Sequence, residues 1–186
     1  MNELLILVDE NDTPIGAKEK MAVHREGLLH RAFSVFIFNT QHQLLLQQRS
    51  ANKYHSPGVW TNTCCSHPNY HEDLQTAVSR RLEQEMGMQC NTKFAFSFVY
   101  KVAFENGLTE HEYDHVYLGI SDDIPVPDST EVSQWKYMDL PTLQLDIKNN
   151  PGNYSEWMKL CLPRMIKFFN NSFLKSSPEV YEYLSI

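Results

Sequence analysis

Hydrophobic positions divide this chain into a first part patterned mainly for strands and a C-terminal part patterned for helices. Short apolar or alternating runs, which are typical of strands, cover residues 4–8, 31–38, 43–48, 94–104, 108–119 and 132–138. Polar residues 39–42 separate the second run from the third, and Glu105-Asn106-Gly107 separates the fourth from the fifth. The pattern therefore predicts two β-hairpins.

An amphipathic helix is predicted between the two hairpins, over residues 73–86, with Gly87 in the position where helices commonly end. Its apolar face consists of Leu74, Ala77, Val78, Leu82 and Met86. After Leu140 the pattern is helical again, and Pro151-Gly152 separates a short helix from a longer one around residues 154–169. This order of elements predicts an α/β or α+β fold in which helices sandwich a mixed sheet.

Length and composition fit one domain. A chain of 186 residues has the size of a single domain, and 42% hydrophobic residues are enough for a sizeable core. We therefore expect one domain over residues 1–186, without an internal linker, whose helical part starts near residue 140.

The overall charge and the cysteines narrow the possible partners and location. The chain has 16 Lys and Arg against 23 Asp and Glu, a net charge of −7, which disfavours binding to nucleic acid or to an anionic membrane. No apolar run approaches the ~20 residues of a membrane span, and no basic segment marks a secretory signal. The four cysteines form no C-x-x-C pair, so we expect a reduced, cytoplasmic protein.

The charge is unevenly distributed along the chain. Residues 18–81 contain eight Lys and Arg against four Asp and Glu, whereas residues 105–146 contain one against ten. The net charge of the whole chain therefore does not exclude an anionic ligand at the basic part or a cation at the acidic part.

Glu110, His111 and Glu112 lie in a predicted strand. Alternate residues of a strand share a face, so the two glutamates would point one way and His111 the other. Two like charges on one face repel each other, and a bound cation is the simplest compensation. The alternative is a solvated strand end close to the turn.

Three histidines, His24, His30 and His67, are candidate metal ligands, because imidazole commonly binds divalent transition metals. Together with Glu110 and Glu112 they would form a mixed nitrogen and oxygen set suited to Mn²⁺, Zn²⁺ or Mg²⁺. Each could instead be an ordinary surface or hydrogen-bonded residue. We assign that ordinary role to His42, His55, His71, His111 and His115.

Several basic residues could bind phosphate. Arg49 and Lys53 lie on a predicted loop before a Pro-Gly turn, and such a pair suits phosphate oxygens. Arg81 and Glu85 are four residues apart near the end of the predicted helix and so share a face, although a surface ion pair explains that spacing equally well. Lys20 completes this basic set.

Cys65 and Trp157 are candidates for chemistry on the substrate. Cys65 lies two residues before His67, and a thiol beside a metal-bound histidine would have an altered proton affinity. A lone cysteine is more often a buried filler residue. A zinc-ligating cysteine would need a second sulfur at a usable spacing, which the adjacent Cys64 cannot easily supply, so acid–base chemistry is the functional alternative. Trp157 lies on an apolar helix face; it is either a core residue or an indole exposed at the edge of a site, where it could stabilise a cation.

Four segments together resemble type I, metal-dependent isopentenyl diphosphate isomerase, a family with the Nudix fold. They are W60-T-N-T-C-C-S-H-P68, R80-R-L-E-Q-E-M-G87, E110-H-E112 and Y154-S-E-W-M158. The resemblance extends from about residue 4 to residue 170, in the order of the family.

The resemblance implies a role for each candidate. Glu112, assisted by Tyr100, would protonate the alkene of isopentenyl diphosphate, Trp157 would stabilise the carbocation, and Cys65 as thiolate would remove a proton on the other side. One divalent metal would be held by His24, His30, His67, Glu110 and Glu112, and Glu85 would help to hold a diphosphate-bound Mg²⁺. The phosphate oxygens would be bound by Lys20, Arg49, Lys53 and Arg81. The implied partner is a small isoprenoid diphosphate, with no nucleic acid or membrane, and a monomer is favoured.

The chain departs from the usual sequence pattern of the family's Nudix box. Ser66 occupies the position of the first glycine of that box, and Glu72 occupies the position of its first glutamate. In its last turn the box keeps only Glu83 and Glu85. Fewer clustered carboxylates weaken the prediction of Nudix hydrolysis of a nucleoside diphosphate derivative. A non-catalytic module that binds diphosphate or metal remains the other alternative.

Overall fold

The structure is a computed structural model that describes residues 3–53 and 55–172. The remaining positions of the expected 1–186 domain lie outside the described residues. The N-terminal elements are β1 (Leu4–Val8), β2 (Pro14–Glu19), α1 (Lys20–Glu26), β3 (His30–Phe38), β4 (Leu44–Arg49), β5 (Trp60–Thr61) and β6 (Cys64–Ser66). They are followed by α2 (Leu74–Met86), β7 (Thr92–Ala103), β8 (Thr109–Ile120), β9 (Val132–Met138), α3 (Leu140–Asn149), a 3₁₀ turn (Pro151–Asn153) and α4 (Glu156–Ser172).

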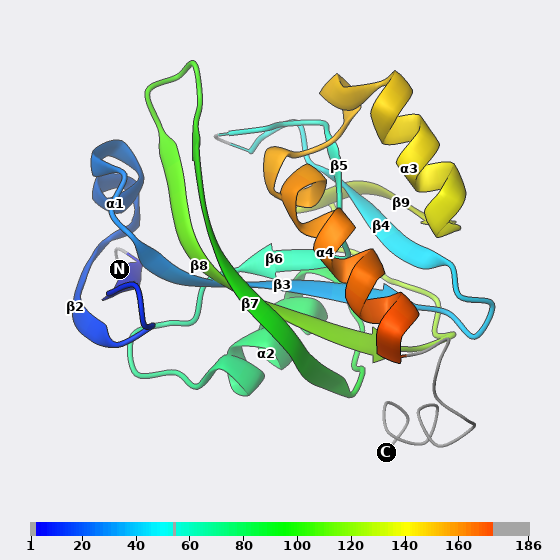
Figure 1. The fold of residues 1–186 in the computed structure, drawn as a ribbon, viewed down its shortest axis with the longest axis horizontal. Coiled ribbons are helices and arrows are strands. Elements are labelled where there is room, and N and C mark those ends of the chain that lie inside the picture. The colour runs from blue at the N-terminus through cyan, green and yellow to red at the C-terminus, as the bar shows by residue number, and fades with distance from the viewer. Residues whose placement is uncertain (1–2, 54, 173–186) are drawn as a thin grey trace.

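The strands form one mixed sheet. β3 pairs in parallel with β8, from His30 opposite Glu112 to Phe38 opposite Ile120. All the other strand pairs in the described residues are antiparallel, including β7 with β8 and β4 with β9. Helix α2 lies on one side of the sheet, and α3 and α4 lie on the other (Figure 1). This is the predicted α/β arrangement of a mixed sheet between helices.

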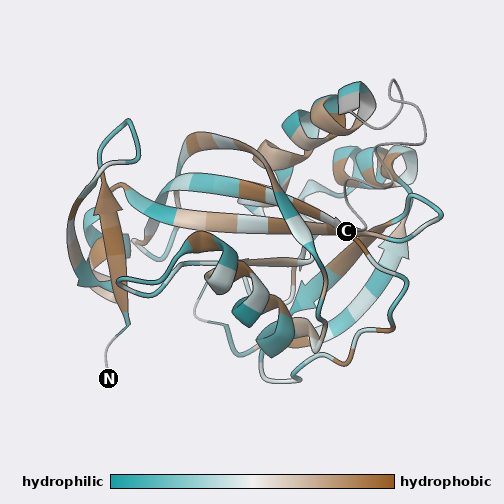
Figure 2. Cartoon of the chain, turned by 90° about the horizontal axis from the view of Figure 1, so that it is seen from below, coloured by the Kyte–Doolittle hydropathy of each residue, from teal (hydrophilic) through white to brown (hydrophobic). Residues whose placement is uncertain are grey.

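Each face of the sheet has its own hydrophobic core. Phe36 and Leu118 pack with α4, whereas Phe33 and Val35 pack with α2. The alternation within β3 follows from the strand period of two, because neighbouring side chains point to opposite faces. Figure 2 shows hydrophobic positions concentrated in the central strands and hydrophilic positions in the turns.

Most of the predicted elements are confirmed. Helix α2 begins after Asp73, whose side chain accepts a hydrogen bond from the backbone N–H of Thr76, and it ends at Gly87 in a left-handed conformation. The predicted second hairpin is β7 and β8. The predicted helical C-terminal part begins at Leu140, but α4 starts at Glu156, because Tyr154 instead forms a β-bridge with Trp60.

The first predicted hairpin is confirmed only next to its turn, where β3 and β4 pair antiparallel. β3 and β4 pair only at Phe38 and Leu44, next to the turn. Beyond that point β4 pairs with β5 and β9, and β3 pairs with β6 and β8. The turn residues are local, but the partner of each strand is selected by long-range packing.

Some short elements had no sequence prediction. β2 pairs with β1, α1 begins after Glu19, whose carboxylate accepts from two backbone N–H groups, and β6 pairs with β3. These elements are 3 to 7 residues long, so each has little periodicity of its own. Among the described residues, no helix is both long enough and apolar enough to cross a bilayer.

Candidate active site

Strand β8 presents two glutamates to one face. Glu110 and Glu112 are both buried, and Tyr100, which lies opposite Glu112 on β7, is between them. The Tyr100 hydroxyl is 2.7 Å from Glu112 Oε2 and 3.2 Å from Glu110 Oε2, within donating distance of each. His111 points to the other face, where its Nδ1 is 3.0 Å from the carbonyl oxygen of Gly27. The predicted division of this strand into two faces is confirmed.

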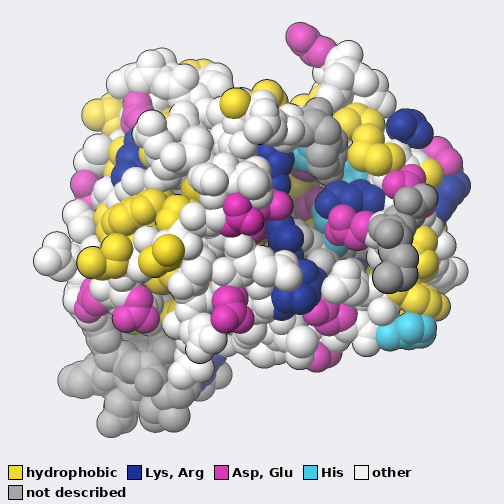
Figure 3. Space-filling view, turned by 180° about the vertical axis from the view of Figure 1, so that it is seen from behind, with side chains coloured by type: hydrophobic (Ala, Val, Ile, Leu, Met, Phe, Trp, Pro, Cys, Tyr) yellow, Lys and Arg dark blue, Asp and Glu magenta, His cyan; other side chains and the backbone are white. Residues whose placement is uncertain are grey.

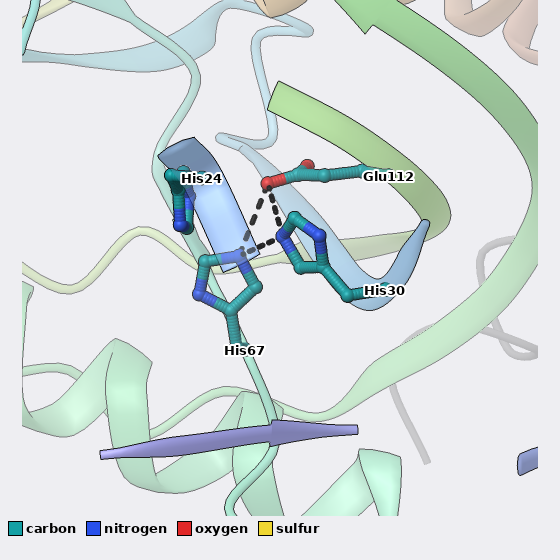
Figure 4. Close-up of side chains that lie close together, drawn as sticks. All are labelled: His24, His30, His67 and Glu112. Carbon is teal, nitrogen blue, oxygen red and sulfur yellow. Dashed lines mark hydrogen bonds and ion pairs between the residues drawn. The ribbon is translucent and has the colours of Figure 1, made fainter. Parts of the chain in front are cut away.

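Three histidines from different elements converge on Glu112. His24 comes from α1, His30 from the first position of β3, and His67 from the segment after β6. One potential ligand atom from each of these four residues lies within 4.8 Å of the others, and all four residues are buried (Figure 4). His67 Nε2 is 3.2 Å from His30 Nε2 and 3.1 Å from Glu112 Oε1.

The hydrogen bonds around this group fit a divalent metal. The Nδ1 atoms of His24 and His30 lie 2.7 and 2.9 Å from the carbonyl oxygens of Lys20 and Leu28, so both can donate there. Each Nε2 is then the lone-pair nitrogen of its ring, as metal-ligating histidines require. Two such nitrogens with a carboxylate oxygen and His67 form a mixed N/O set of the kind that binds divalent ions.

His24, His67 and Glu112 rest in ligand-competent protonation states, whereas Glu110 does not. Burial lowers the pKa of His67 to about 4 and lowers the pKa of His24, so both rings are neutral near pH 7. Burial alone would raise the pKa of Glu112, but His67 and His30, whose Nε2 atoms lie 3.1 and 3.7 Å from its Oε1, hold the pKa well below its ordinary value. Burial and the charge of Glu112 together raise the pKa of Glu110 well above its ordinary value.

A cavity opens beside this group. It is lined by Lys20, Arg49, Lys53, His55, Cys65, Ser66, His67, Arg81, Glu85, Tyr100, Glu110, Glu112 and Trp157. Apart from His24 and His30, every candidate site residue is in this lining, and His30 adjoins it through His67 and Glu112. Figure 3 shows the opening, with histidines at its base and basic and acidic side chains around its rim.

Two neighbouring cysteines have opposite orientations in β6. Cys65, which lies opposite Ser34 of β3, lines the cavity. Cys64 is fully buried in the core that packs against α2. Burial raises the pKa of the Cys65 thiol well above its ordinary value, and the charge of Arg49 opposes this rise. The protonated thiol is therefore its resting form.

The basic residues of the cavity are paired with carboxylates. Lys20 Nζ is 3.0 Å from Glu3, and Lys53 forms a salt bridge with Glu131. Arg81 Nη2 is 3.5 Å from the same Glu131. A diphosphate entering the cavity would therefore meet positive groups that already have anionic partners.

Arg49 is held differently. Its Nε donates to the carbonyl oxygen of Ser56 at 3.0 Å and its Nη2 to that of His55 at 3.2 Å. Its guanidinium also lies 5.1 Å from the ring centre of Trp157. Arg49 thus joins the loop after β4 to helix α4.

Helix α2 supplies one carboxylate to the cavity. Glu85 is buried, accepts from Gln47 Nε2 at 2.9 Å, and forms a salt bridge with Arg81. Glu72, in the first glutamate place of the box, is instead bound by both Nε and Nη2 of Arg80 at 2.7 Å and does not line the cavity.

The structure decides between the two alternatives for Trp157 and changes the assignment of His55. Trp157 is a core residue, only 2% exposed, and it also lines the cavity, so its indole is not at an exposed edge. His55 was assigned an ordinary role, yet it lines the cavity with its Nε2 3.4 Å from Glu110 Oε1. No spacing in the sequence links these residues, because His55 lies on a loop and reaches Glu110 only through the tertiary fold.

Comparisons with known proteins agree with this arrangement. A NUDIX domain matches residues 28–160. Isopentenyl-diphosphate Delta-isomerase 2 of Aromatoleum aromaticum is 49% identical over 166 residues, covering 89% of this chain and 88% of the relative. Isopentenyl-diphosphate Delta-isomerase of Burkholderia multivorans is 49% identical over 164 residues, covering 88% of this chain and 93% of the relative.

Solved structures share the fold at low sequence identity. DR0079 from Deinococcus radiodurans has a TM-score of 0.72 at 20% identity and covers 87% of this chain and 98% of its own. A MutT NUDIX hydrolase from Burkholderia pseudomallei has a TM-score of 0.57 at 17% identity, covering 73% and 96%. These two show the fold, whereas the domain match and the 49% identical relatives show that the chain belongs to the isopentenyl-diphosphate Delta-isomerases of the NUDIX family.

Proposed function

We propose that this protein interconverts isopentenyl diphosphate and dimethylallyl diphosphate in isoprenoid biosynthesis, as the names of its relatives indicate for those proteins. The observation that carries the proposal is that Cys65 and the pair Tyr100–Glu112 line the same cavity. An allylic isomerase needs two groups that exchange protons with different carbons of one substrate, and this cavity contains both.

Glu112, assisted by Tyr100, would add a proton to the terminal CH₂ carbon of isopentenyl diphosphate. Because the pKa of Glu112 is held well below its ordinary value, the carboxylate has to take up this proton before the forward reaction. The electron pair of the double bond forms the new C–H bond and leaves a tertiary carbocation. Cys65 as thiolate would then take a proton from C2, and the electrons of that C–H bond would form the new double bond. One proton is gained and one is lost, so the substrate and the product are isomers.

The surroundings suit a carbocation. The indole of Trp157 lines the cavity and can stabilise positive charge through its ring face. Burial of Trp157, Tyr100 and Glu112 keeps bulk water from a cation that water would quench.

The resting thiol of Cys65 is consistent with a reversible reaction. In the reverse direction the thiol would donate the proton and the Glu112 carboxylate would accept one. In the forward direction the thiolate depends on Arg49, whose charge lowers the pKa of Cys65. Arg49 would in this way act on the proposed base, Cys65, as well as on the diphosphate.

We assign the metal and phosphate contacts as follows. His24, His30, His67, Glu110 and Glu112 would hold one divalent ion, Mn²⁺, Zn²⁺ or Mg²⁺, and Glu85 a Mg²⁺ that arrives with the diphosphate. When bound, the first ion supplies positive charge that fixes the orientation of Glu112. Lys20, Arg49, Lys53 and Arg81 would bind the phosphate oxygens, with the domain acting as a monomer on this small molecule.

Incubation with isopentenyl diphosphate, Mg²⁺ and Mn²⁺ in D₂O tests the proposal. We expect dimethylallyl diphosphate and deuterium in the recovered substrate and product. Absence of both would refute isomerisation. Release of phosphate or of a nucleoside monophosphate from nucleoside diphosphate derivatives under the same conditions would instead support the hydrolase alternative, which does not need Cys65.

A further inference from the structure

His55 is in contact with three parts of the active site. The residue is 7% exposed, and its Nε2 lies 3.4 Å from Glu110 Oε1. Its ring is edge-on to Trp157, with ring centres 5.8 Å apart at 80°. Its backbone carbonyl accepts the hydrogen bond from Arg49 Nη2. No role for this residue follows from the acid, base, metal and phosphate assignments made above.

Aromatic neighbours define the orientation of the His55 ring. The ring stacks with Phe104 at 5.6 Å and 27°, and with His24 at 6.3 Å and 28°. Stacked and edge-on contacts of this kind favour particular ring orientations. In the orientation observed, a ring nitrogen faces the carboxylate of Glu110.

We propose that His55 is a positioning residue that fixes the orientation of the Glu110 carboxylate relative to the indole of Trp157. Glu110 in turn shares the Tyr100 hydroxyl with Glu112. A rotation of Glu110 would therefore alter both the donor set proposed for the metal and the hydrogen bond that orients Glu112. His55 acts through these residues and not on the substrate itself. The inference rests on the proposed isomerisation.

The contact with Glu110 belongs to the side chain and the contact with Arg49 to the backbone, so substitution can separate them. His55→Phe keeps an aromatic ring against Trp157 and Phe104 but has no nitrogen for Glu110. His55→Gln loses the ring but keeps an N–H donor that can reach Glu110. Neither variant removes the carbonyl that accepts from Arg49.

Two measurements on each variant test the proposal. They are the Mn²⁺ affinity of the protein without substrate, by calorimetry, and the kcat and KM for isopentenyl diphosphate. We expect His55→Phe to weaken Mn²⁺ binding about tenfold and to lower kcat about tenfold. Tenfold is the lower end of the effect of removing a residue that hydrogen-bonds a metal ligand from outside the ligand set. KM should stay within about twofold, because Arg49 keeps its hydrogen bond.

His55→Gln should recover most of the Mn²⁺ affinity and remain intermediate in kcat, because the donor is restored without the contact to Trp157. The matched control is His111→Gln, a histidine substitution on the opposite face of β8, which should leave both quantities within about twofold. If His55→Phe does not fold, His55→Leu carries the same test, because leucine also lacks a nitrogen.

Mn²⁺ affinity and kcat equal to those of the unsubstituted protein in His55→Phe would overturn the proposal. A raised KM with unchanged kcat would also overturn it, because the effect would then lie in phosphate binding. If the unsubstituted protein makes no allylic product, the proposed function fails by itself, and the Mn²⁺ affinities still decide whether His55 positions Glu110.

Discussion

The two sides of the cavity differ in how completely the protein holds its own side chains in place. On the side proposed for the metal, His24, His30 and Glu112 come from regular elements, and the side chains of His30 and Glu112 are 0% and 10% exposed. On the phosphate side, the side chains of Lys53 and Arg81 are each 21% exposed and both lie near one carboxylate. The residues proposed to bind the metal are held in place by the protein itself, whereas those proposed to bind phosphate are held by protein carboxylates that a diphosphate would have to displace.

This difference has an energetic basis. Leaving a buried polar group without its hydrogen-bond partner costs about 1–3 kcal/mol, because that group stays desolvated. A partly exposed ion pair contributes only about 0.2–1 kcal/mol. We therefore expect substitutions at the proposed metal ligands to abolish activity, and substitutions at the proposed phosphate-binding residues to change KM modestly.

The largest effect is expected for Glu112→Gln. The variant removes the proposed acid and one charged ligand, so kcat should fall about 10³-fold or more and Mn²⁺ affinity should fall with it. Steady-state kinetics and calorimetry measure the two. Unchanged Mn²⁺ affinity would remove Glu112 from the metal group.

Cys65→Ala should lower kcat about 10²–10⁴-fold while leaving Mn²⁺ affinity unchanged, because the thiol lines the cavity without belonging to the His/Glu group. Cys64→Ala is the matched control. Its thiol is fully buried in the core on the other side of β6, so its loss should reduce stability by about 1 kcal/mol and leave kcat nearly unchanged. Retained activity in Cys65→Ala would refute its role as the base.

Removal of the metal should destabilise the protein. A ligand present at 100 times its Kd contributes about 2.7 kcal/mol to folding, which corresponds to about 5–10 °C in Tm for a domain of this size. Thermal melting with and without EDTA measures the change. Glu112→Gln should show a much smaller response to EDTA, and an equal response would locate the stabilising metal elsewhere.

Glu131→Gln should have a modest effect on the phosphate side. It releases Lys53 and Arg81 from their shared carboxylate, so KM for the diphosphate should fall about two- to fivefold with kcat nearly unchanged. The control is Glu156→Gln, which breaks the surface pair with Lys159 on α4. A rise in KM would mean that Glu131 organises the lysine and the arginine and does not compete for them.

The smallest effect is expected for His111→Ala. Its side chain contacts the Gly27 carbonyl on the face of β8 opposite the glutamates, so kcat should stay within about twofold. Comparison with Glu112→Gln in one assay tests the strand faces directly. Equal losses would mean that both faces of β8 serve the reaction.

Features that depend on nearby residues could be predicted from the sequence. The spacing from Leu74 to Met86 and the glycine that follows located α2, and the alternation of Glu110 with His111 divided β8 into two faces. These features follow from helix and strand periods, which segments of 12 or 13 residues such as β8 and α2 carry by themselves.

Features that depend on distant residues could not be predicted. The separation of β3 from β4, the pairing of Glu72 with Arg80 away from the cavity, and the contact of His55 with Glu110 all required the packed structure. Burial of Trp157 belongs to the same group, because it depends on how α4 packs against the sheet.

The sequence by itself determined the fold class, the residue types available for chemistry, and a resemblance to one enzyme family. The tertiary structure decided which of those residues meet. The parallel register of β3 with β8 brings His30 opposite Glu112, and the pairing of β6 with β3 turns Cys65 toward the cavity and Cys64 into the core. Strand register is set by the burial of whole faces of the sheet, and a one-residue shift would reverse every side chain. For that reason the candidate residues could be predicted from the sequence, whereas their contacts with one another depend on the tertiary structure.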